Sequence, residues 1–262
     1  MQDLVGRTAL VSGSTTELGY EILKFLAARG AQVVVHGILP MPDGQALAGA
    51  LTATYGVRAD YLSVDLTDAA ATEQMAQEIL ARFGKCDIVV NNAVVRHFKS
   101  VEDMTAAEWS NALAVNLSSA FHFARAFVPG MKASNWGRII NMSSIYGFRG
   151  AENRLDYVTT KTALLGLTRG LAIELAKTGI TCNAVAPGTV PTEAIQSRIV
   201  SLARERGQSQ SEAEAEYLVG RNPSGRFVST ENVAAMIGFL CSEAAKDING
   251  ATLPIDGGWT AL

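Results

Sequence analysis

NMSSIYGFRGAENRLDYVTTK, residues Asn141 to Lys161, joins a predicted buried strand to a predicted helix. Ser144 follows the apolar run GRIINMS, so its hydroxyl is expected at the carboxyl end of a strand, the edge at which open α/β sheets bind ligands. Tyr157 and Lys161 are four residues apart, which in a helix places both side chains on one face, one turn apart. A cation held beside a phenol favours the phenolate. The segment therefore predicts a site for proton transfer at the edge of an α/β sheet.

On both sides of this segment, short apolar runs rich in β-forming residues alternate with longer helical patterns. Strands that alternate with helices are typical of a parallel sheet with crossover helices on both faces. Because no repeat, linker or low-complexity tract divides the chain, we expect one doubly wound, Rossmann-like α/β domain over residues 1–262. The predicted strands are 8–12, 31–36, 59–64, 86–92, 137–143 and 180–187.

Residues 189–228 interrupt this pattern with a polar, charge-rich helical segment. Because it follows the sixth predicted strand, it would lie over the ligand-binding edge and could act as a lid. The alternative is a surface helical hairpin with no part in binding. The sequence alone leaves these two interpretations equally open.

The composition excludes several classes of protein. With 262 residues, 48% of them hydrophobic, the chain is long enough for a sizeable core. A net charge of −3 with scattered signs gives no basic footprint for nucleic acid or for an anionic membrane. The three cysteines are far apart, which fits neither a disulfide framework nor a zinc site. With no signal architecture and no apolar run near the roughly 18 residues of a membrane span, we expect a soluble cytoplasmic protein without a metal site.

The first predicted strand runs into SGSTTELG, residues 12–19, and then into a helix. This order is typical of a dinucleotide site, in which glycines let the backbone approach the pyrophosphate. Glycine turns are also common as plain connections, so the motif alone is weak. The second predicted strand ends at His36, Gly37 and Ile38, with neither the acidic residue that binds the ribose of NAD nor a basic one for NADP. We favour NAD because a 2′-phosphate normally requires a fixed cation, and NADP is the alternative.

Several motifs occur together in a fixed order along nearly the whole chain. They are SGSTTELG, VDLTD, CDIVVNNA, the asparagine of AVNLSSAF, the SS and YVTTK pair, and NAVAPGTVPT. Taken together, they resemble the short-chain dehydrogenase/reductase family. Within that family the STTELG turn, the HG after the second strand, SRIVSLARERG and the ending DGGWTAL are most similar to bacterial D-3-hydroxybutyrate dehydrogenases. The resemblance implies an NAD(P)-dependent oxidoreductase that transfers hydride between nicotinamide and a secondary alcohol or ketone.

The resemblance also implies roles for individual residues. Tyr157 would be the general acid/base, and Lys161 would stabilise its phenolate and bond the nicotinamide ribose. Ser144 would bond the substrate oxygen, and Asn116 would hold a water that relays protons. Structural alternatives are that Asn116 is a buried helix residue and that Asp65 merely caps the next helix. The implied cofactor contacts are Gly13, Thr15, Leu18, Gly19, Asp65, Leu66, Asn91, Ala93, Tyr157, Lys161, Pro187, Gly188, Val190 and Thr192.

Two positions depart from the family pattern, since Glu17 and Val94 stand where glycine is usual. A carboxylate is favourable at a helix N-terminus in itself. Beside a pyrophosphate, however, it repels the cofactor unless its side chain turns outward. We therefore expect Glu17 to weaken cofactor affinity without abolishing it.

The expected substrate pocket also differs from that of the hydroxybutyrate enzymes, which surround a carboxylate with glutamine, histidine, lysine, tryptophan and glutamine. At the matching positions this chain has Arg96, Tyr146, Arg154, Thr189 and Arg198. Because a guanidinium can grip a carboxylate through two hydrogen bonds, these residues predict an anionic small-molecule substrate, 3-hydroxybutyrate-like or more highly charged, such as a dicarboxylate. The alternative is that some of these arginines are solvated, Arg198 above all. The predicted substrate-binding set is Arg96, Ser144, Tyr146, Arg154, Tyr157 and Arg198.

We therefore expect an oxidoreductase that acts on a small hydroxy or keto acid. One alternative is a 3-oxoacyl-carrier-protein reductase, in which basic residues at the rim would meet an acidic carrier protein. Another is a catalytically silent family member that binds nucleotide, which Glu17 and Val94 make conceivable and the intact catalytic set argues against. His97, beside Arg96, is expected to be a structural bystander rather than a substrate contact. The resemblance further implies a homotetramer, formed through the two long helices and the C-terminal segment.

Overall fold

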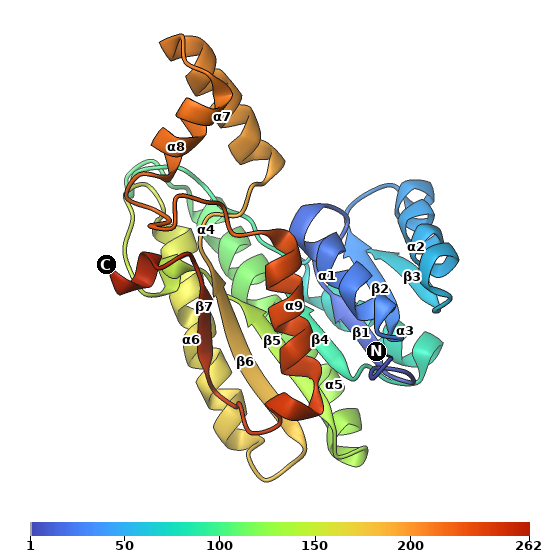
Figure 1. The fold of residues 1–262 in the computed structure, drawn as a ribbon. Helices are drawn as coiled ribbons and strands as arrows, with labels where there is room; N and C mark the ends of the chain where they lie inside the picture. Colours follow the sequence, from blue (N-terminus) through green and yellow to red (C-terminus); the bar gives the residue numbers. More distant parts are fainter. Residues whose placement is uncertain (1) are drawn as a thin grey trace.

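A seven-stranded parallel sheet runs through the middle of the molecule, in the order β3-β2-β1-β4-β5-β6-β7 (Figure 1). The computed structural model describes residues 2–262. The six predicted strands are all present, and the doubly wound parallel arrangement is confirmed. The strands are β1 (Thr8–Val11), β2 (Gln32–Gly37), β3 (Ala59–Ser63), β4 (Ile88–Asn91), β5 (Gly137–Met142), β6 (Ile180–Pro187) and β7 (Thr252–Ile255).

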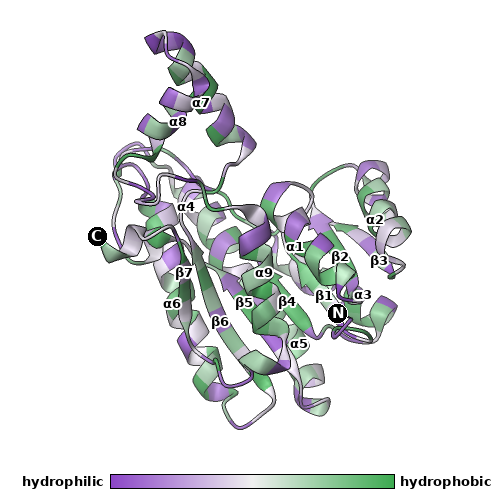
Figure 2. Ribbon diagram, viewed as in Figure 1, coloured by the Kyte–Doolittle hydropathy of each residue, from purple (hydrophilic) through white to green (hydrophobic). Residues whose placement is uncertain are grey.

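Helices cover both faces of this sheet. On one face Leu23 of α1 and Ile237 of α9 are fully buried in one apolar cluster with residues of the strands. On the other face Ile79 of α3 and Phe127 of α5 belong to a second cluster. The strands are accordingly mostly hydrophobic, and the hydrophilic residues gather on the outer faces of the helices (Figure 2). The helices are α1 (Glu17–Ala28), α2 (Met41–Tyr55), α3 (Ala69–Phe83), α4 (Ala106–Leu113), α5 (Ser119–Ala133), α6 (Leu155–Glu174), α7 (Glu193–Arg206), α8 (Gln210–Leu218) and α9 (Thr230–Cys241).

Strand β7 is an element that the sequence pattern does not predict. It has only four residues, most of them partly exposed, and it contains Pro254. A proline is tolerated there because β7 is an edge strand, where one missing donor costs little. Its pairing with β6 runs as far as Pro187 and Ile255, so the chain that follows β7 reaches the carboxyl edge of the sheet.

The helical stretch between β4 and β5 is interrupted. After α4 the chain forms one π-helical turn, Ala114–Ser118, and then continues as α5. Such turns insert one extra residue and occur frequently at functional sites. The turn carries Asn116, whose side chain is buried.

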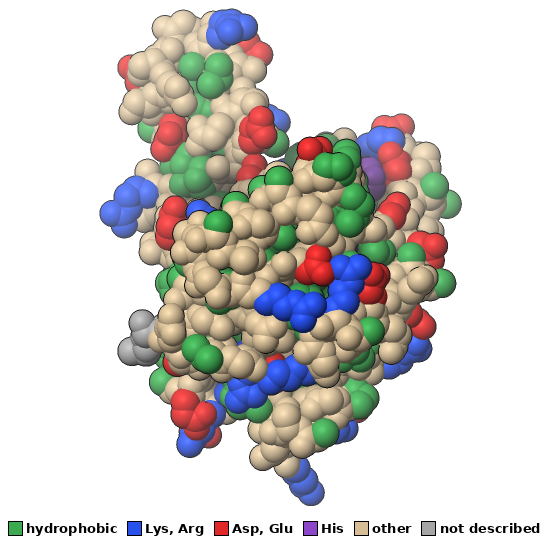
Figure 3. Space-filling view, turned by 90° about the vertical axis from the view of Figure 1, so that its right-hand side faces the viewer, with side chains coloured by type: hydrophobic (Ala, Val, Ile, Leu, Met, Phe, Trp, Pro, Cys, Tyr) green, Lys and Arg blue, Asp and Glu red, His purple; other side chains and the backbone are tan. Residues whose placement is uncertain are grey.

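Helices α7 and α8 form a hairpin that stands clear of the sheet (Figures 1 and 3). Ile199, Ala203 and Ala213 give the hairpin a small apolar cluster of its own. At its base, Thr192 and Ile195 line the cavity described below. The segment thus combines features of both interpretations, because it is a self-packed hairpin whose base forms part of a ligand-sized cavity.

Charged side chains of both signs are interspersed on the face seen in Figure 3. No helix within residues 2–262 is long and apolar enough to cross a bilayer. The same part of the chain contains no group of three or more His, Cys, Asp or Glu side chains placed to hold a metal ion.

Candidate active site

A cavity of about 530 Å³ opens at the carboxyl edge of the sheet. Its walls come from the segments that follow β1 to β6, from the base of α7, from the segment after α8 and from the C-terminus. Strands β1 and β4 are neighbours although β2 and β3 come between them in sequence. Ligands of open α/β sheets bind at such a switch point, and the volume suits a small-molecule site.

The turn between β1 and α1 forms one end of this cavity. Gly13 has a φ of +62°, and a Cβ atom there would lie 2.8 Å from the Cα atom of Ala93. The backbone N–H of Gly13 donates to Nδ1 of His36 at 2.9 Å, and Nε2 of His36 lies 3.1 Å from the carbonyl oxygen of Val64. Burial lowers the pKa of His36 to about 4, so the ring is neutral and holds the turn against the segment after β3.

The N-terminus of α1 points at the same end. Leu18 and Gly19, in the first turn of the helix, line the cavity, and the first N–H groups of a helix together with its dipole favour an anion. A Cβ atom on Gly19 would lie 2.3 Å from the carbonyl oxygen of Gly13, so only glycine fits. These residues therefore fit the pyrophosphate of a dinucleotide.

Glu17 lines the cavity beside this anion site, and its carboxylate is bonded to the α7–α8 hairpin. Its φ is +48°, a left-handed conformation that costs a residue with a Cβ atom about 1–2 kcal/mol. Its Oε1 accepts a hydrogen bond from the backbone N–H of Glu193, the first residue of α7, at 2.6 Å. The carboxylate thus links the cofactor turn to the α7–α8 hairpin.

Asp65, after β3, lies exposed at the cavity. Its Oδ1 accepts from the backbone N–H of Thr67 at 2.9 Å. The cap of α3 is Asp68, which accepts from Ala71 at 3.0 Å. Capping therefore does not account for Asp65, which remains available to a ligand.

Asn91 departs from its predicted place. Its side chain is buried and donates to Oδ1 of Asn141 at 2.7 Å, and it is not among the residues that line the cavity. Its neighbour Asn92 does line the cavity, and its amide donates to the carbonyl oxygens of Ser12 and Gly13 at 3.0 and 2.8 Å. Consecutive side chains of a strand face opposite sides of the sheet, which explains why Asn92 lines the cavity and Asn91, at the end of β4, does not.

Ser144, Tyr157 and Lys161 line the other end of the cavity. Ser144 follows β5 and is 6% exposed; its oxygen accepts from the backbone N–H of Tyr146 at 3.3 Å, which leaves the hydroxyl hydrogen for a ligand. The Nζ atom of Lys161 lies 5.5 Å from the centroid of the Tyr157 ring and donates to the Met142 carbonyl oxygen at 2.6 Å. The predicted arrangement of a hydroxyl, a phenol and an amine in one cavity is therefore present.

Lys161 is buried, and this burial together with the nearby charge of Arg96 lowers its pKa to about 7. Ser143 lines the cavity beside Ser144, but its hydroxyl donates to the Lys161 carbonyl oxygen at 2.9 Å. Ser143 therefore fixes α6 to the end of β5.

The side chain of Asn116 is bonded within the protein, and its expected role of holding a water stays a prediction. Its Oδ1 accepts from the N–H of Val95 at 2.8 Å, and its Nδ2 donates to the Val95 carbonyl oxygen at 2.8 Å and to Oγ1 of Thr160 at 3.1 Å. It lies outside the residues that line the cavity. Because both hydrogens of the amide are already bonded, the side chain is a positioning group that joins the π-helical turn, the segment after β4 and α6.

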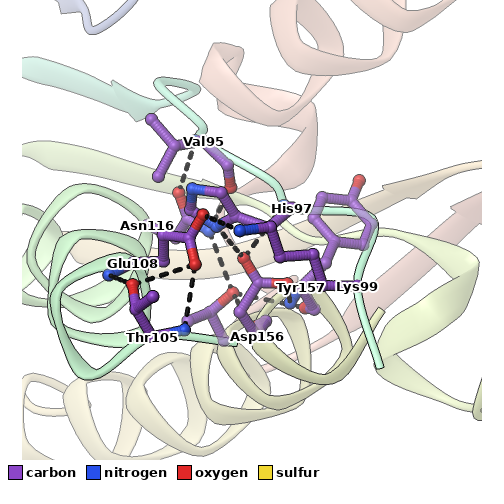
Figure 4. Close-up of polar contacts among 9 residues, drawn as sticks. Val95, His97, Lys99, Thr105, Glu108, Asn116, Asp156 and Tyr157 are labelled. Atoms are coloured by element: carbon purple, nitrogen blue, oxygen red, sulfur yellow. Dashed lines mark hydrogen bonds and ion pairs between the residues drawn. The ribbon is translucent and has the colours of Figure 1, made fainter. Parts of the chain in front are cut away.

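Four of the five residues 95–99 contact α4, α6 or the π-helical turn between α4 and α5; Figure 4 shows the bonds of Val95, His97 and Lys99. Besides the bonds from Val95 to Asn116, the carboxylate of Asp156 accepts from the backbone N–H of His97 at 3.1 Å and from its Nδ1 at 2.8 Å. Phe98 lies under the guanidinium of Arg154, 3.6 Å from its ring centroid. Lys99 donates to Glu108 at 2.6 Å. The exception is Arg96, whose side chain lines the cavity; His97 is thus structural, as expected.

The aromatic wall of this end is formed by Tyr146, Tyr157 and Trp259. The ring of Tyr146 lies edge-on to Tyr157 at 6.1 Å and to Trp259 at 5.8 Å between centroids. Arg154 is half-buried and lies 5.9 Å from the Tyr146 ring. Burial lowers the pKa of Arg154, although neighbouring tyrosines raise it.

The structure therefore brings most of the predicted site residues together. Arg198 is an exception, since it is exposed on α7 and does not line the cavity. Tyr217, Arg221 and Trp259 line it without having been predicted. Nothing in the sequence around them marks them as site residues, because they reach the cavity at the end of α8, in the segment after it and in the segment after β7. The predicted residues that line it are Gly13, Thr15, Leu18, Gly19, Asp65, Leu66, Ala93, Arg96, Ser144, Tyr146, Arg154, Tyr157, Lys161, Pro187, Gly188, Val190 and Thr192.

Comparison with known proteins agrees with this site. The family described as enoyl-(acyl carrier protein) reductase matches residues 13–260. A D-beta-hydroxybutyrate dehydrogenase of Cupriavidus necator is 40% identical over 259 residues, which cover 98% of this chain and 99% of that relative. A 3-oxoacyl-[acyl-carrier-protein] reductase of Aquifex aeolicus is 35% identical, covering 97% and 98%.

Among solved structures, the L-sorbose reductase of Gluconobacter frateurii in complex with NADPH and L-sorbose superposes with a TM-score of 0.93 at 27% identity, over the full length of both chains. These matches and the site together show that the chain is an NAD(P)-dependent oxidoreductase that belongs to the short-chain dehydrogenase/reductase family.

Proposed function

We propose that the protein interconverts the secondary alcohol of a small hydroxy acid and the corresponding ketone, with NAD as the preferred cofactor. The observation that carries this proposal is the pair of guanidinium groups, Arg96 and Arg154, which line the cavity beside Ser144 and Tyr157. A guanidinium binds a carboxylate through two parallel hydrogen bonds. A substrate held in this way would present its hydroxyl or carbonyl oxygen to the catalytic side chains.

Each catalytic residue has a distinct task in this reaction. In oxidation, Tyr157 takes the proton of the alcohol, and in reduction it returns one. Ser144 donates its hydroxyl hydrogen to the same substrate oxygen and stabilises the charge that develops there. Lys161 places a cationic group beside the Tyr157 ring. When bound, the nicotinamide accepts or supplies the hydride.

The preference for NAD rests on the charges around the adenosine end. The wall at the end of β2 consists of neutral His36, Gly37 and Ile38, and Asp65, after β3, is acidic. The basic residues that line the cavity all belong to the substrate end. A 2′-phosphate would therefore enter a place without a cation to bind it.

We infer that the molecule acts as a homotetramer in the cytoplasm. The exposed apolar side chains of Phe121 on α5 and Ile173 on α6 support an interface over the long helices. The free thiols of Cys86, Cys182 and Cys241 are all buried, which suits a reducing compartment. Light scattering of the purified protein and fractionation of cells test the two statements.

The decisive test of the function is a screen of hydroxy and keto acids with NAD and NADP, followed by absorbance at 340 nm. We expect turnover of carboxylated alcohols, with kcat/KM falling at least tenfold when the carboxylate is removed. Equal turnover of an unsubstituted alcohol would reject the proposal. Preference for a 3-oxoacyl carrier protein over free acids would identify a carrier-protein reductase instead.

A further inference from the structure

Arg221 is a cavity residue that the chemistry described so far does not use. It lies between α8 and α9, half-buried, and its guanidinium carbon is 4.2 Å from the centroid of the Tyr217 ring. One of its nitrogens, Nη1, donates to the Tyr217 carbonyl oxygen. A guanidinium has five N–H groups, so these contacts fix its plane and leave most donors for a ligand.

The backbone that carries Arg221 is tied to the end of β6. The side chain of the next residue, Asn222, is buried; its Oδ1 accepts from the N–H of Thr189 at 3.2 Å, and its Nδ2 donates to the carbonyl oxygen of Arg226 at 2.8 Å. The N–H of Arg221 donates to the Leu218 carbonyl oxygen at 2.9 Å. Arg221 therefore belongs to the fixed wall of the cavity rather than to the far end of the hairpin.

The charged residues of the cavity divide into two groups. The acidic residues are Glu17 and Asp65, both at the cofactor end, whereas the other end is lined by Lys161 and three arginines, Arg96, Arg154 and Arg221. Within residues 2–262, none of these three arginines forms an ion pair with a carboxylate.

The charge of Arg96 reaches two of the other cations. The charge of Arg96 adds to burial in lowering the pKa of both Lys161 and Arg154, and Tyr217 acts on Arg154 while it stacks on Arg221. Arg96 is exposed and the other two arginines are partly buried, and like charges that line one cavity without a counter-ion disfavour one another. One carboxylate has two oxygens, so two guanidinium forks saturate it and the third remains unmatched.

We infer that the substrate carries a second oxyanion group, a carboxylate or a phosphate, and that Arg221 binds it. The inference rests on the proposed function, in which Arg96 and Arg154 hold the first carboxylate. Arg221 stacks on Tyr217, whereas Arg154 stacks on Phe98, so the two guanidinium groups are held by different aromatic side chains and the two anionic groups occupy different places in the cavity. The substrate class is therefore a hydroxy or keto acid with two anionic groups.

Matched substrates test this inference. 3-Hydroxyglutarate differs from 3-hydroxybutyrate by one carboxylate, and 3-hydroxyhexanoate has a neutral chain of similar length. We expect kcat/KM for 3-hydroxyglutarate to exceed that for both monoanions at least tenfold. 3-Hydroxy-4-phosphonooxybutyrate carries a phosphate in place of the second carboxylate. The dianion with the higher kcat/KM identifies the second anionic group as a carboxylate or a phosphate. Equal or lower kcat/KM for both dianions would overturn the inference.

The Arg221→Gln variant assigns the preference to one residue. Loss of a charge-assisted hydrogen bond should raise KM for the dianion roughly 10- to 100-fold, while KM for 3-hydroxybutyrate stays within about threefold. Arg226→Gln is the matched control, because Arg226 is exposed and outside the cavity. An equal loss for monoanion and dianion, or no loss for either, would contradict the assignment.

A binding measurement separates this inference from the proposed function. Glutarate and butyrate have no alcohol, so calorimetric titration of the NAD-loaded enzyme with each acid requires no turnover. Glutarate should bind at least tenfold more tightly than butyrate, and Arg221→Gln should abolish the difference. If this result is obtained while no hydroxy acid is oxidised, the proposed reaction fails and the dianion site stands. If hydroxy acids are oxidised but both acids bind equally, the dianion site alone is rejected.

Discussion

Replacing Asp156 by asparagine tests how the segment that carries Arg96 is held beside α6, the helix that carries Tyr157 and Lys161. The carboxylate of Asp156 is fully buried. Its Oδ1 accepts from the backbone N–H of Tyr157 at 2.7 Å, and its Oδ2 accepts from the backbone N–H and the Nδ1 of His97 at 3.1 and 2.8 Å. A carboxylate accepts hydrogen bonds on both of its oxygens, whereas the side-chain amide of asparagine accepts on its oxygen and donates from its nitrogen.

The size of the effect follows from this geometry. Whichever way the amide of Asp156→Asn is turned, its NH₂ group faces a backbone N–H, of Tyr157 or of His97. A buried donor left without an acceptor costs about 1–3 kcal/mol, and loss of the charged acceptor weakens the remaining bonds. At about 2–4 °C per kcal/mol for a chain of this size, the midpoint of thermal unfolding should fall by roughly 3–10 °C. Because the freed segment carries Arg96, KM for the acid substrate should rise more than kcat falls.

Calorimetry and steady-state kinetics with a carboxylated substrate measure both quantities. Asp103→Asn is the matched control, since Asp103 is exposed and accepts only from the hydroxyl of Ser100, at 2.8 Å. His97→Ala provides a milder perturbation, because it removes one of the three bonds and leaves both backbone donors paired. An Asp156→Asn protein with wild-type unfolding temperature and wild-type KM would refute the reasoning.

Three further substitutions probe the site. Tyr157→Phe should lower kcat at least 100-fold, as expected for loss of a general acid/base. The Kd for NAD, measured by calorimetry, should change less than about fivefold. Retention of most activity would remove Tyr157 from the mechanism. Arg96→Gln should raise KM for the acid roughly 10- to 100-fold. The charge of Arg96 helps to lower the pKa of Lys161 to about 7, so removal of Arg96 raises that pKa. The limb of the pH profile of kcat/KM that follows loss of the lysine proton should therefore move to higher pH. A limb at unchanged pH would show that Lys161 does not govern the pH dependence. Glu17→Gly should relieve the left-handed strain and remove the carboxylate from the pyrophosphate site, so that NAD binds several-fold more tightly. Loss of the contact with Glu193 should at the same time raise KM for the substrate. An unchanged Kd for NAD together with an unchanged KM would contradict the role given to Glu17.

The elements of the fold were predictable where local patterns are strong. Apolar runs bounded by turns gave six of the seven strands, because buried strands of a parallel sheet are apolar throughout. Strand β7 was not predicted, because it is short, partly exposed and contains Pro254. The π-helical turn at Asn116 was not predicted, because one inserted residue leaves the helical pattern of the sequence almost unchanged.

The site shows the same division between local and distant information. Ser144, Tyr157 and Lys161 lie within one strand-to-helix segment, so their spacing alone indicates that they share a face and an edge. Arg221 and Trp259 join them only because the chain returns to the same edge after α8 and after β7. Resemblance to relatives pointed to Arg198 for the same task, but the turn of α7 directs that side chain to solvent.

The sequence by itself therefore determined the parallel α/β architecture, and it predicted the glycine turn after β1 and the shared site of Ser144, Tyr157 and Lys161. These features depend on residues close together in the chain, whose periodicity and spacing fix their geometry. Only the tertiary structure decided that Glu17 contacts α7, that Asn116 positions rather than lines the site, and that Arg221 completes a cluster of unpaired cations. Such features depend on contacts between segments distant in sequence, which local patterns do not encode because packing of the whole chain sets them.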